Sequence, residues 1–132
     1  MIPRGLRNNN PGNIRLSCTP WKGEVRPPQD VSFCRFSTVA YGYRALIKLL
    51  QNYRTLHHCH TLADFIHRWA PLSENDTQGY VQCVCRELRV SPSYVPDVYD
   101  RHTMCLLAAA VSKVENGVPA QMADVIAGWR LL

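Results

Sequence analysis

Glu115 is the residue of this sequence best placed to do chemistry. It follows Met104, Ala108 and Val111 at steps of four, three and four residues, which places all four side chains on one face of an α-helix. Gly117 comes two residues later and is typical of a helix C-terminus. Because burial disfavours the charged form of a carboxyl group, a glutamate on this apolar face suits a general acid that cleaves a glycosidic bond near neutral pH. The alternative is a glutamate at the solvated edge of the helix or paired with an arginine.

Glu74 is a second candidate carboxylate. It lies in Ser73-Glu-Asn-Asp76, which has the form of a capping box that opens a helix. The helix macrodipole favours an ionised carboxylate in the first turn, so this position suits a group that orients water or binds sugar hydroxyls. Favourable charge at a helix start explains Glu74 equally well.

The elements that position these residues are mainly helical. Apolar spacing predicts a helix from Thr38 to about Arg54, with one apolar face made of Ala45, Leu46, Leu49, Leu50 and Tyr53. A capping box at Thr61-Leu-Ala-Asp64 opens a short helix that Pro71 halts, and a third helix runs from Ser73 to Leu88. Two more are expected over residues 101–115 and 121–130, the last presenting Met122, Val125, Ile126 and Trp129.

The first 37 residues differ from the rest of the chain. They are rich in Asn, Pro and Gly, with a turn at Asn10-Pro-Gly-Asn13 and short extended pieces around residues 14–16 and 31–36. A chain of 132 residues, 46% of them hydrophobic, is long enough for one compact domain. We therefore expect a single, mainly α domain over residues 1–132, with a small loop and β lobe at 1–37 and a helical lobe at 38–132.

Composition narrows the partners and the location. A formal net charge of +5 favours polyanions such as nucleic acid, anionic lipid or acidic cell-wall polymers, but no zinc-finger or RNA-recognition spacing points to a specific nucleic acid. No apolar run reaches the roughly 18 residues of a membrane span, and residues 1–7 lack the apolar stretch of a secretory signal. We expect synthesis in the bacterial cytoplasm and delivery to the cell wall or periplasm by a phage particle, a holin-type route or a secretion machine.

The cysteines and histidines indicate no cofactor. The six cysteines form no C-x-x-C pair, and most are expected to pack as small apolar residues. Cys18 and Cys34 flank a predicted β segment and could form a disulfide in an oxidising compartment. His57, His58 and His60 could bind a metal ion, but a solvated turn is the expected interpretation. We expect neither a metal ion nor another cofactor.

Several motifs in this order resemble those of the lysozyme-like glucosaminidases, which include flagellar peptidoglycan hydrolases. The motifs are RNNNPGNIR at residues 7–15, WKG at 21–23, FCRF at 33–36 and GYRA at 42–45. The chain also resembles phage virion or structural proteins with an R-G-x-R-N-N-N-P-x-N-I-R opening and a W-A-P-x-x-E-N-x-T-x-x-Y motif, found here at residues 69–80. Together these segments cover about two thirds of the chain.

One segment stands in a different place. In the glucosaminidases the catalytic glutamate ends a helix that precedes the asparagine loop, whereas the segment of this chain that looks like that helix, residues 106–117, comes late. A circular permutation explains this order, because the termini of domains often lie close together. It predicts that residues 104–117 pack beside the loop at residues 8–15.

The resemblance implies a monomeric peptidoglycan glycan-strand hydrolase that needs no metal. It would cleave the β-1,4 bond between amino sugars by glucosaminidase, muramidase or lytic transglycosylase chemistry. Glu115 is then the general acid. Asp30 stands about where the family's hairpin carries an acidic residue, with Glu24 near it beside Trp21. Both also suit solvated loop acids.

Candidate substrate-binding residues complete this hypothesis. Asn75, Thr77 and Tyr80 could hydrogen-bond to sugar or N-acetyl groups, and Trp21, Tyr41 and Tyr43 could stack on sugar rings. Asn10 and Asn13 could shape the loop that lines the groove. Packing, capping or turn propensity explains each of these residues about as well. Two alternative functions stay open: a non-catalytic virion or cell-wall-binding protein that has kept the fold, and a basic nucleic-acid-binding helical domain.

Overall fold

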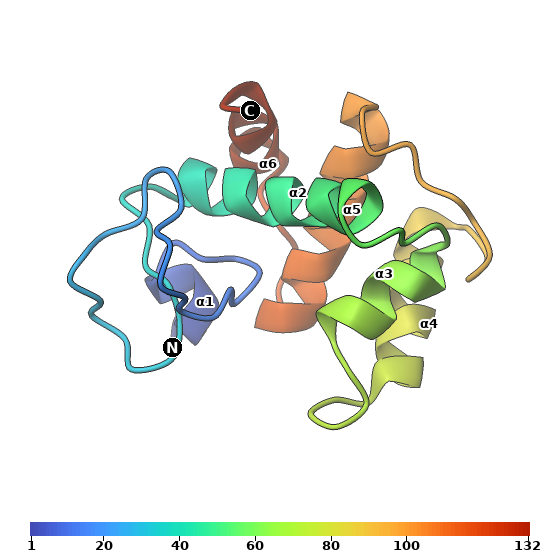
Figure 1. The fold of residues 1–132 in the computed structure, drawn as a ribbon, viewed down its shortest axis with the longest axis horizontal. Helices are drawn as coiled ribbons and strands as arrows, with labels where there is room; N and C mark the ends of the chain where they lie inside the picture. The colour runs from blue at the N-terminus through green and yellow to red at the C-terminus, as the bar shows by residue number, and fades with distance from the viewer.

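The computed structural model describes all residues 1–132 and is mainly helical, as the sequence predicts (Figure 1). Its helices are α1 (Arg4–Arg7), α2 (Val39–Thr55), α3 (Leu62–Trp69), α4 (Thr77–Leu88), α5 (Arg101–Asn116) and α6 (Met122–Arg130). None of them has both the length and the apolar character that crossing a membrane requires.

Local capping residues set several helix ends where the sequence places them. The Thr38 side chain accepts a hydrogen bond from the Tyr41 amide at the start of α2. Thr61 and Asp64 form both bonds of the predicted capping box before α3. Gly117 ends α5 with φ 73°, a left-handed conformation that glycine adopts without steric cost.

The predicted capping box at Ser73 to Asp76 is wrong. Helix α4 begins at Thr77, and the Asp76 side chain caps it by accepting a hydrogen bond from the Gly79 amide at 3.1 Å. Glu74 therefore lies in the turn before the helix. The macrodipole argument for an ionised Glu74 no longer applies, because that effect is confined to the terminal turn.

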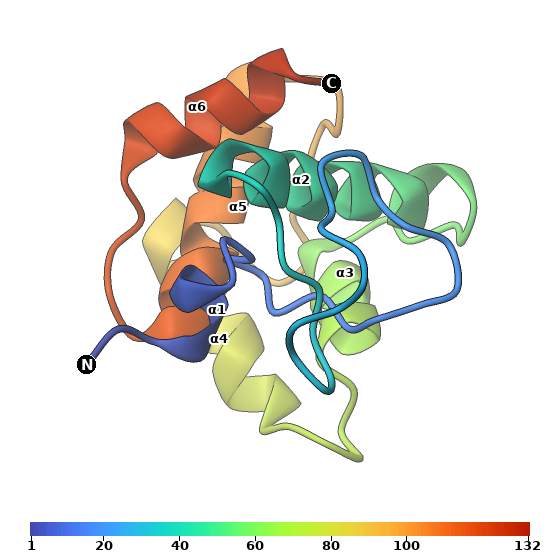
Figure 2. The ribbon, with the colours of Figure 1, turned by 90° about the vertical axis from the view of Figure 1, so that its left-hand side faces the viewer.

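Helices α2 to α6 enclose the main core. On α5, Met104, Ala108 and Val111 are fully buried, which confirms the predicted face. The predicted face of α6 is only partly right: Val125 is fully buried, but Met122 is exposed. Helix α6 lies against α2, as both ribbon views show (Figures 1 and 2). Gly128 of α6 is at this contact, next to the backbone of Ala40 and Arg44.

The N-terminal lobe has little regular structure. In place of the extended pieces predicted around residues 14–16 and 31–36 there are two isolated antiparallel bridges, between Arg15 and Phe33 and between Glu24 and Phe36. A small apolar cluster joins the lobe to α2, and it consists of Ile14, Cys34, Phe36 and Ala45. Polar contacts must therefore supply much of the definition of this lobe.

Polar contacts of this kind define the asparagine loop at residues 8–13. Asn10 is fully buried; its side chain accepts a hydrogen bond from the Ile14 amide and donates to the carbonyl oxygens of Ile14 and Cys34. Asn9 and Asn13 have φ of 52° and 50°, in the left-handed region that asparagine tolerates better than most residues. The loop thus needs asparagine at these positions for its own shape.

The loop packs beside the end of α5. Asn116 is buried and donates to the carbonyl oxygen of Pro11 at 2.9 Å, and Gly5 of α1 lies against the same side chain. The prediction that residues 104–117 pack beside residues 8–15 is confirmed.

The cysteines are all free thiols. Cys18 is exposed while Cys34 is buried, so the disulfide considered between them is absent. His57, His58 and His60 are exposed, and no group of three His, Cys, Asp or Glu residues is placed to hold a metal ion.

Gly42 lies where α2 packs against the asparagine loop, and its substitution tests this contact. A Cβ at this position would lie only 1.9 Å from the carbonyl oxygen of Asn9, which is backbone and has no freedom to move aside. Alanine normally stabilises a helix interior relative to glycine, yet we expect Gly42→Ala to lower the free energy of unfolding by about 1 to 3 kcal/mol. Chemical denaturation measures this. An unchanged or raised stability would contradict the close packing.

Candidate functional site

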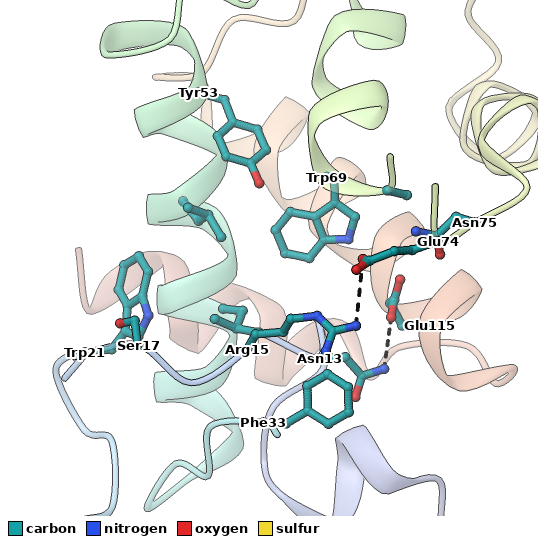
Figure 3. A pocket seen from close by; sticks show the side chains of 14 residues that line it. Asn13, Arg15, Ser17, Trp21, Phe33, Tyr53, Trp69, Glu74, Asn75 and Glu115 are labelled. Carbon is teal, nitrogen blue, oxygen red and sulfur yellow. Dashed lines mark hydrogen bonds and ion pairs between the residues drawn. The ribbon is translucent and has the colours of Figure 1, made fainter. Parts of the chain in front are cut away.

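A pocket of about 550 Å³ lies where the N-terminal lobe faces α2, α3 and α5 (Figure 3). The lobe contributes Gly12, Asn13, Ile14, Arg15, Ser17, Trp21 and Phe33. The helical part contributes Leu49, Tyr53, Trp69, Ala70, Glu74, Asn75 and Glu115. The wall therefore combines two carboxylates, one guanidinium and several aromatic rings, a composition suited to a polar ligand with apolar faces.

Glu115 lines this pocket from the last turn of α5 and is half-buried. Its Oε1 accepts a hydrogen bond from Asn13 Nδ2 at 2.9 Å, and its Oε2 accepts one from the Tyr80 hydroxyl at 2.9 Å. Asn13 lies 102 residues away in the sequence and Tyr80 lies 35 residues away. Each carboxyl oxygen is thus held by a different part of the chain.

Tyr80 lies behind Glu115 and does not line the pocket. Burial is the main cause that holds the pKa of Tyr80 far above its usual value, and the negative charge of Glu115 raises it further. The hydroxyl group therefore keeps its proton and acts as the donor to Glu115. The structure assigns Tyr80 a contact with the carboxylate in place of the direct sugar contact that the sequence suggested.

Glu74 is the second carboxylate on the pocket. Its side chain is 56% exposed, and Oε2 lies 3.8 Å from Nη2 of Arg15 (Figure 3). The Arg15 guanidinium also lies over the Phe33 ring, 5.3 Å from its centroid. An exposed ion pair of this kind contributes at most about 1 kcal/mol, so Glu74 remains free to turn toward a ligand.

Asp30, the third candidate catalytic carboxylate, does not line the pocket. Its carboxylate accepts hydrogen bonds from Arg4 and Asn8 and from the backbone amides of Ser32 and Phe33. The bond to Arg4 is the main cause that holds the pKa of Asp30 well below its usual value. Asp30 is fully engaged in holding α1 to the loop at residues 30–33.

Glu24 also has a structural role. Its carboxylate accepts a hydrogen bond from the Trp21 amide at 2.9 Å and pairs with Nε of Arg26 at 2.5 Å. No part of the Glu24 side chain is exposed, so it has no access to a ligand.

The remaining candidates divide into two groups. Asn13, Trp21 and Asn75 line the pocket with Glu74 and Glu115. Four others do not line it, and each has a packing or hydrogen-bonding role elsewhere. Asn10 makes hydrogen bonds within the asparagine loop, and Tyr41 packs against Gly23. Tyr43 forms a hydrogen bond with Ser112, and Thr77 donates one to the Ala70 carbonyl oxygen. For these four the structure supports the packing alternatives.

Tyr53 is a pocket residue that the sequence did not reveal. Its side chain is only 8% exposed, yet its hydroxyl points into the pocket and has no hydrogen-bond partner within the protein (Figure 3). Burial raises the pKa of Tyr53 to about 12, so the hydroxyl is a neutral donor. The Trp69 ring meets it edge-on, with centroids 6.2 Å apart. Helical spacing placed Tyr53 on the core face of α2, and that pattern cannot separate core from pocket wall.

Comparison with known proteins places the chain in a phage protein family. No protein-family model matches the sequence. The chain is 32% identical over 117 residues to Protein P5 of Pseudoalteromonas phage PM2, with 86% of this chain and 71% of that protein aligned. The chain belongs to the family of this phage protein.

We expect the Asp30 carboxylate to make the stability of the fold decrease in acid. Because its folded pKa lies below the unfolded value, its ionised form stabilises the fold above about pH 4, and this contribution is lost as pH falls below that value. We expect Asp30→Asn to lower the denaturation midpoint at pH 7 and to match the wild type more closely near pH 2. Glu74→Gln, which loses only the long contact to Arg15, is the control. A constant difference across this pH range would show that Asp30 does not act through its charge.

Proposed function

We propose that this member of the Protein P5 family cleaves the glycan strands of peptidoglycan at a β-1,4 bond between amino sugars. The observation that carries the proposal is Glu115, a carboxylate on the wall of a pocket of about 550 Å³, held through both oxygens by Asn13 and Tyr80. This volume falls within the usual range for small-ligand sites. Trp21 and Trp69 supply aromatic surface of the kind that stacks on sugar rings.

We further propose a lysozyme-like fold whose segments are circularly permuted. The helix that carries Glu115 comes late in the chain, and it packs against the asparagine loop through Asn116 and Asn13. A helix moved from the front of the asparagine loop to a later position in the sequence would keep this contact. The mainly helical architecture with a small, irregular lobe supports the same proposal.

In the proposed reaction Glu115 gives a proton to the glycosidic oxygen as its bond to the sugar carbon breaks. The electron pair of that bond leaves with the oxygen, and Glu115 becomes a carboxylate. Asn13 and Tyr80 then stabilise the carboxylate, because hydrogen bonds to an ionised acceptor are stronger than bonds to a neutral one. Asn13 and Tyr80 thus hold Glu115 in place and also stabilise the carboxylate that it becomes after it has given up its proton.

Glu74, the other carboxylate on the pocket, is the group that we propose to assist the acid. Its weak contact with Arg15 leaves it free to remove a proton from an attacking water or to stabilise the positive charge on the sugar carbon. A substrate hydroxyl that attacks instead of water gives an anhydro sugar. The mass of the released muropeptides distinguishes these two outcomes.

We propose that the part of the pocket lined by Tyr53 and Trp69, here called the acetamido recess, binds an acetamido group. The methyl group would pack on the Trp69 ring and on Leu49, while the carbonyl oxygen would accept a hydrogen bond from the unpartnered Tyr53 hydroxyl. Amino sugars with N-acetyl groups match this combination of one donor and apolar walls.

The test of Glu115 is Glu115→Gln, which removes the acid without changing its size. We expect lysis of purified sacculi to fall by about 100-fold or more, with an unchanged circular dichroism spectrum. Glu87→Gln is the matched control, since Glu87 pairs with Lys113 on the exposed surface and should keep wild-type activity. Activity retained in Glu115→Gln would refute the site.

An inert wild type would favour a different function. Binding to sacculi without release of muropeptides would identify a non-catalytic cell-wall-binding protein. Binding to DNA that weakens steeply with salt, without any effect on sacculi, would identify a nucleic-acid-binding domain.

Tyr53→Phe tests the acetamido recess. Removing one hydrogen bond of about 1 kcal/mol should weaken the binding of N-acetylated chito-oligosaccharides about fivefold and leave de-N-acetylated ones unaffected. Calorimetry in a Glu115→Gln background measures both affinities without turnover. The control is Tyr41→Phe, which lies outside the pocket. Equal effects of Tyr53→Phe on the two ligands would place the acetamido group elsewhere.

A further inference from the structure

Two buried amide oxygens beside Glu115 have no hydrogen-bond partner. They are Oδ1 of Asn13 and Oδ1 of Asn116. Both oxygens lie next to Gly5. A Cβ added to Gly5 would be 2.7 Å from Oδ1 of Asn13, 2.6 Å from Oδ1 of Asn116 and 2.8 Å from the Asn10 carbonyl oxygen. A buried acceptor without a donor has lost its hydrogen bonds to water and gained none in return, which is unfavourable. The two unpartnered oxygens therefore face the same region, and the Asn10 carbonyl oxygen beside them already accepts a hydrogen bond from the Asn13 backbone amide at 3.0 Å.

Asn116 cannot supply that donor. Its Nδ2 already donates to the carbonyl oxygens of Pro11 and Ser112, each at 2.9 Å. A half-turn of this amide would place its oxygen against those two carbonyls. The orientation of Asn116 is therefore fixed.

Asn13 is different, because its Nδ2 has one partner only, Oε1 of Glu115. The oxygen and nitrogen of an amide occupy nearly the same space, so a half-turn exchanges them without moving other groups. The turned Nδ2 would face Oδ1 of Asn116 and the Asn10 carbonyl. The turned Oδ1 would face Oε1 of Glu115, which is repulsive for a carboxylate and favourable for a carboxylic acid that donates its proton.

We infer that the Asn13 amide has two orientations and that the proton on Glu115 selects between them. With Glu115 ionised, Asn13 donates to Oε1, as in the structure. With Glu115 protonated, Asn13 turns, accepts the acid proton and donates toward Asn116. Asn13 is thus a positioning residue for the acid, an assignment that deepens the proposed function and depends on it only for its catalytic meaning.

The other groups around Glu115 do not compete for this proton. Tyr80, from α4, donates to Oε2 and keeps its own proton, since burial and the charge of Glu115 hold its pKa far above the usual value. Arg15 and Glu74, from the two loops that border the pocket, pair with each other at 3.8 Å. Oε1 is therefore the oxygen that carries the acid proton, and Asn13 is the protein group that meets it.

The two orientations of the Asn13 amide correspond to two stages of one catalytic cycle of the proposed reaction. Before bond cleavage the acid proton is held between Oε1 and the turned Asn13. When that proton passes to the glycosidic oxygen, Glu115 becomes a carboxylate and Asn13 turns back to donate to it. The amide replaces the lost proton with a hydrogen bond at the same oxygen.

Glu115→Gln provides the decisive test, because the glutamine imitates the protonated acid at every pH. Tyr80 donates to the glutamine oxygen, which leaves the glutamine NH₂ facing Asn13 and requires Asn13 to present its oxygen. In NMR spectra of labelled protein we expect nuclear Overhauser effects from the Asn13 amide protons to the Gly5 α-protons at all pH values. In the wild type these signals should be absent whenever the carboxyl carbon of Glu115 has the chemical shift of a carboxylate, and present whenever it has that of the protonated acid.

Two controls isolate the effect. Glu74→Gln removes the other pocket carboxylate and should keep the wild-type pattern, and the Asn116 amide protons should stay near Pro11 throughout. An Asn13 amide that remains away from Gly5 in Glu115→Gln would overturn the inference. The measurement needs no turnover, so an inert wild type whose amide still turns would refute only the proposed function.

Discussion

The contact between the asparagine loop and the end of α5 is the constraint on which the site depends. Asn116 donates to Pro11, and one residue earlier Glu115 accepts from Asn13, so two successive residues of one helix bind a loop about 100 positions away. Without this loop, Glu115 would be a glutamate at a solvated helix end. The loop turns that helix end into the wall of a pocket.

The lobe that carries the loop is held more by polar contacts than by apolar burial. Its apolar cluster has four buried residues, one of them from α2, whereas the main core has 22. The hydrogen bonds of the buried Asn10 side chain and the five hydrogen bonds that Asp30 accepts fix the shape of the lobe, because directed bonds replace the contacts that these groups would make with water. An asparagine-rich sequence is what such a lobe requires.

Local signals in the sequence were enough for the helices but not for the partners of their side chains. Thr61, Asp64 and Gly117 act within one turn, so the pattern around them predicts helix ends correctly. Asp30 and Arg4 are 26 residues apart, and no local pattern encodes their bond. Tyr53 shares the face of α2 with true core residues, and only the three-dimensional arrangement of α3 and the loop shows that a pocket opens there. The position of α5 beside the loop came from the resemblance, not from spacing.

The three candidate carboxylates differ in how firmly the protein holds them, and this difference decides which one suits a general acid. Asp30 accepts bonds from two side chains and two backbone amides, which commits it to the charged form. Glu74 has one long ion pair, and more than half of its side chain is exposed. Glu115 lies between these extremes: Tyr80 fixes one oxygen, and the other faces an amide that can either donate or accept. An acid must hold its position while its proton leaves, and of the three only Glu115 has partners that suit both its protonated and its ionised form.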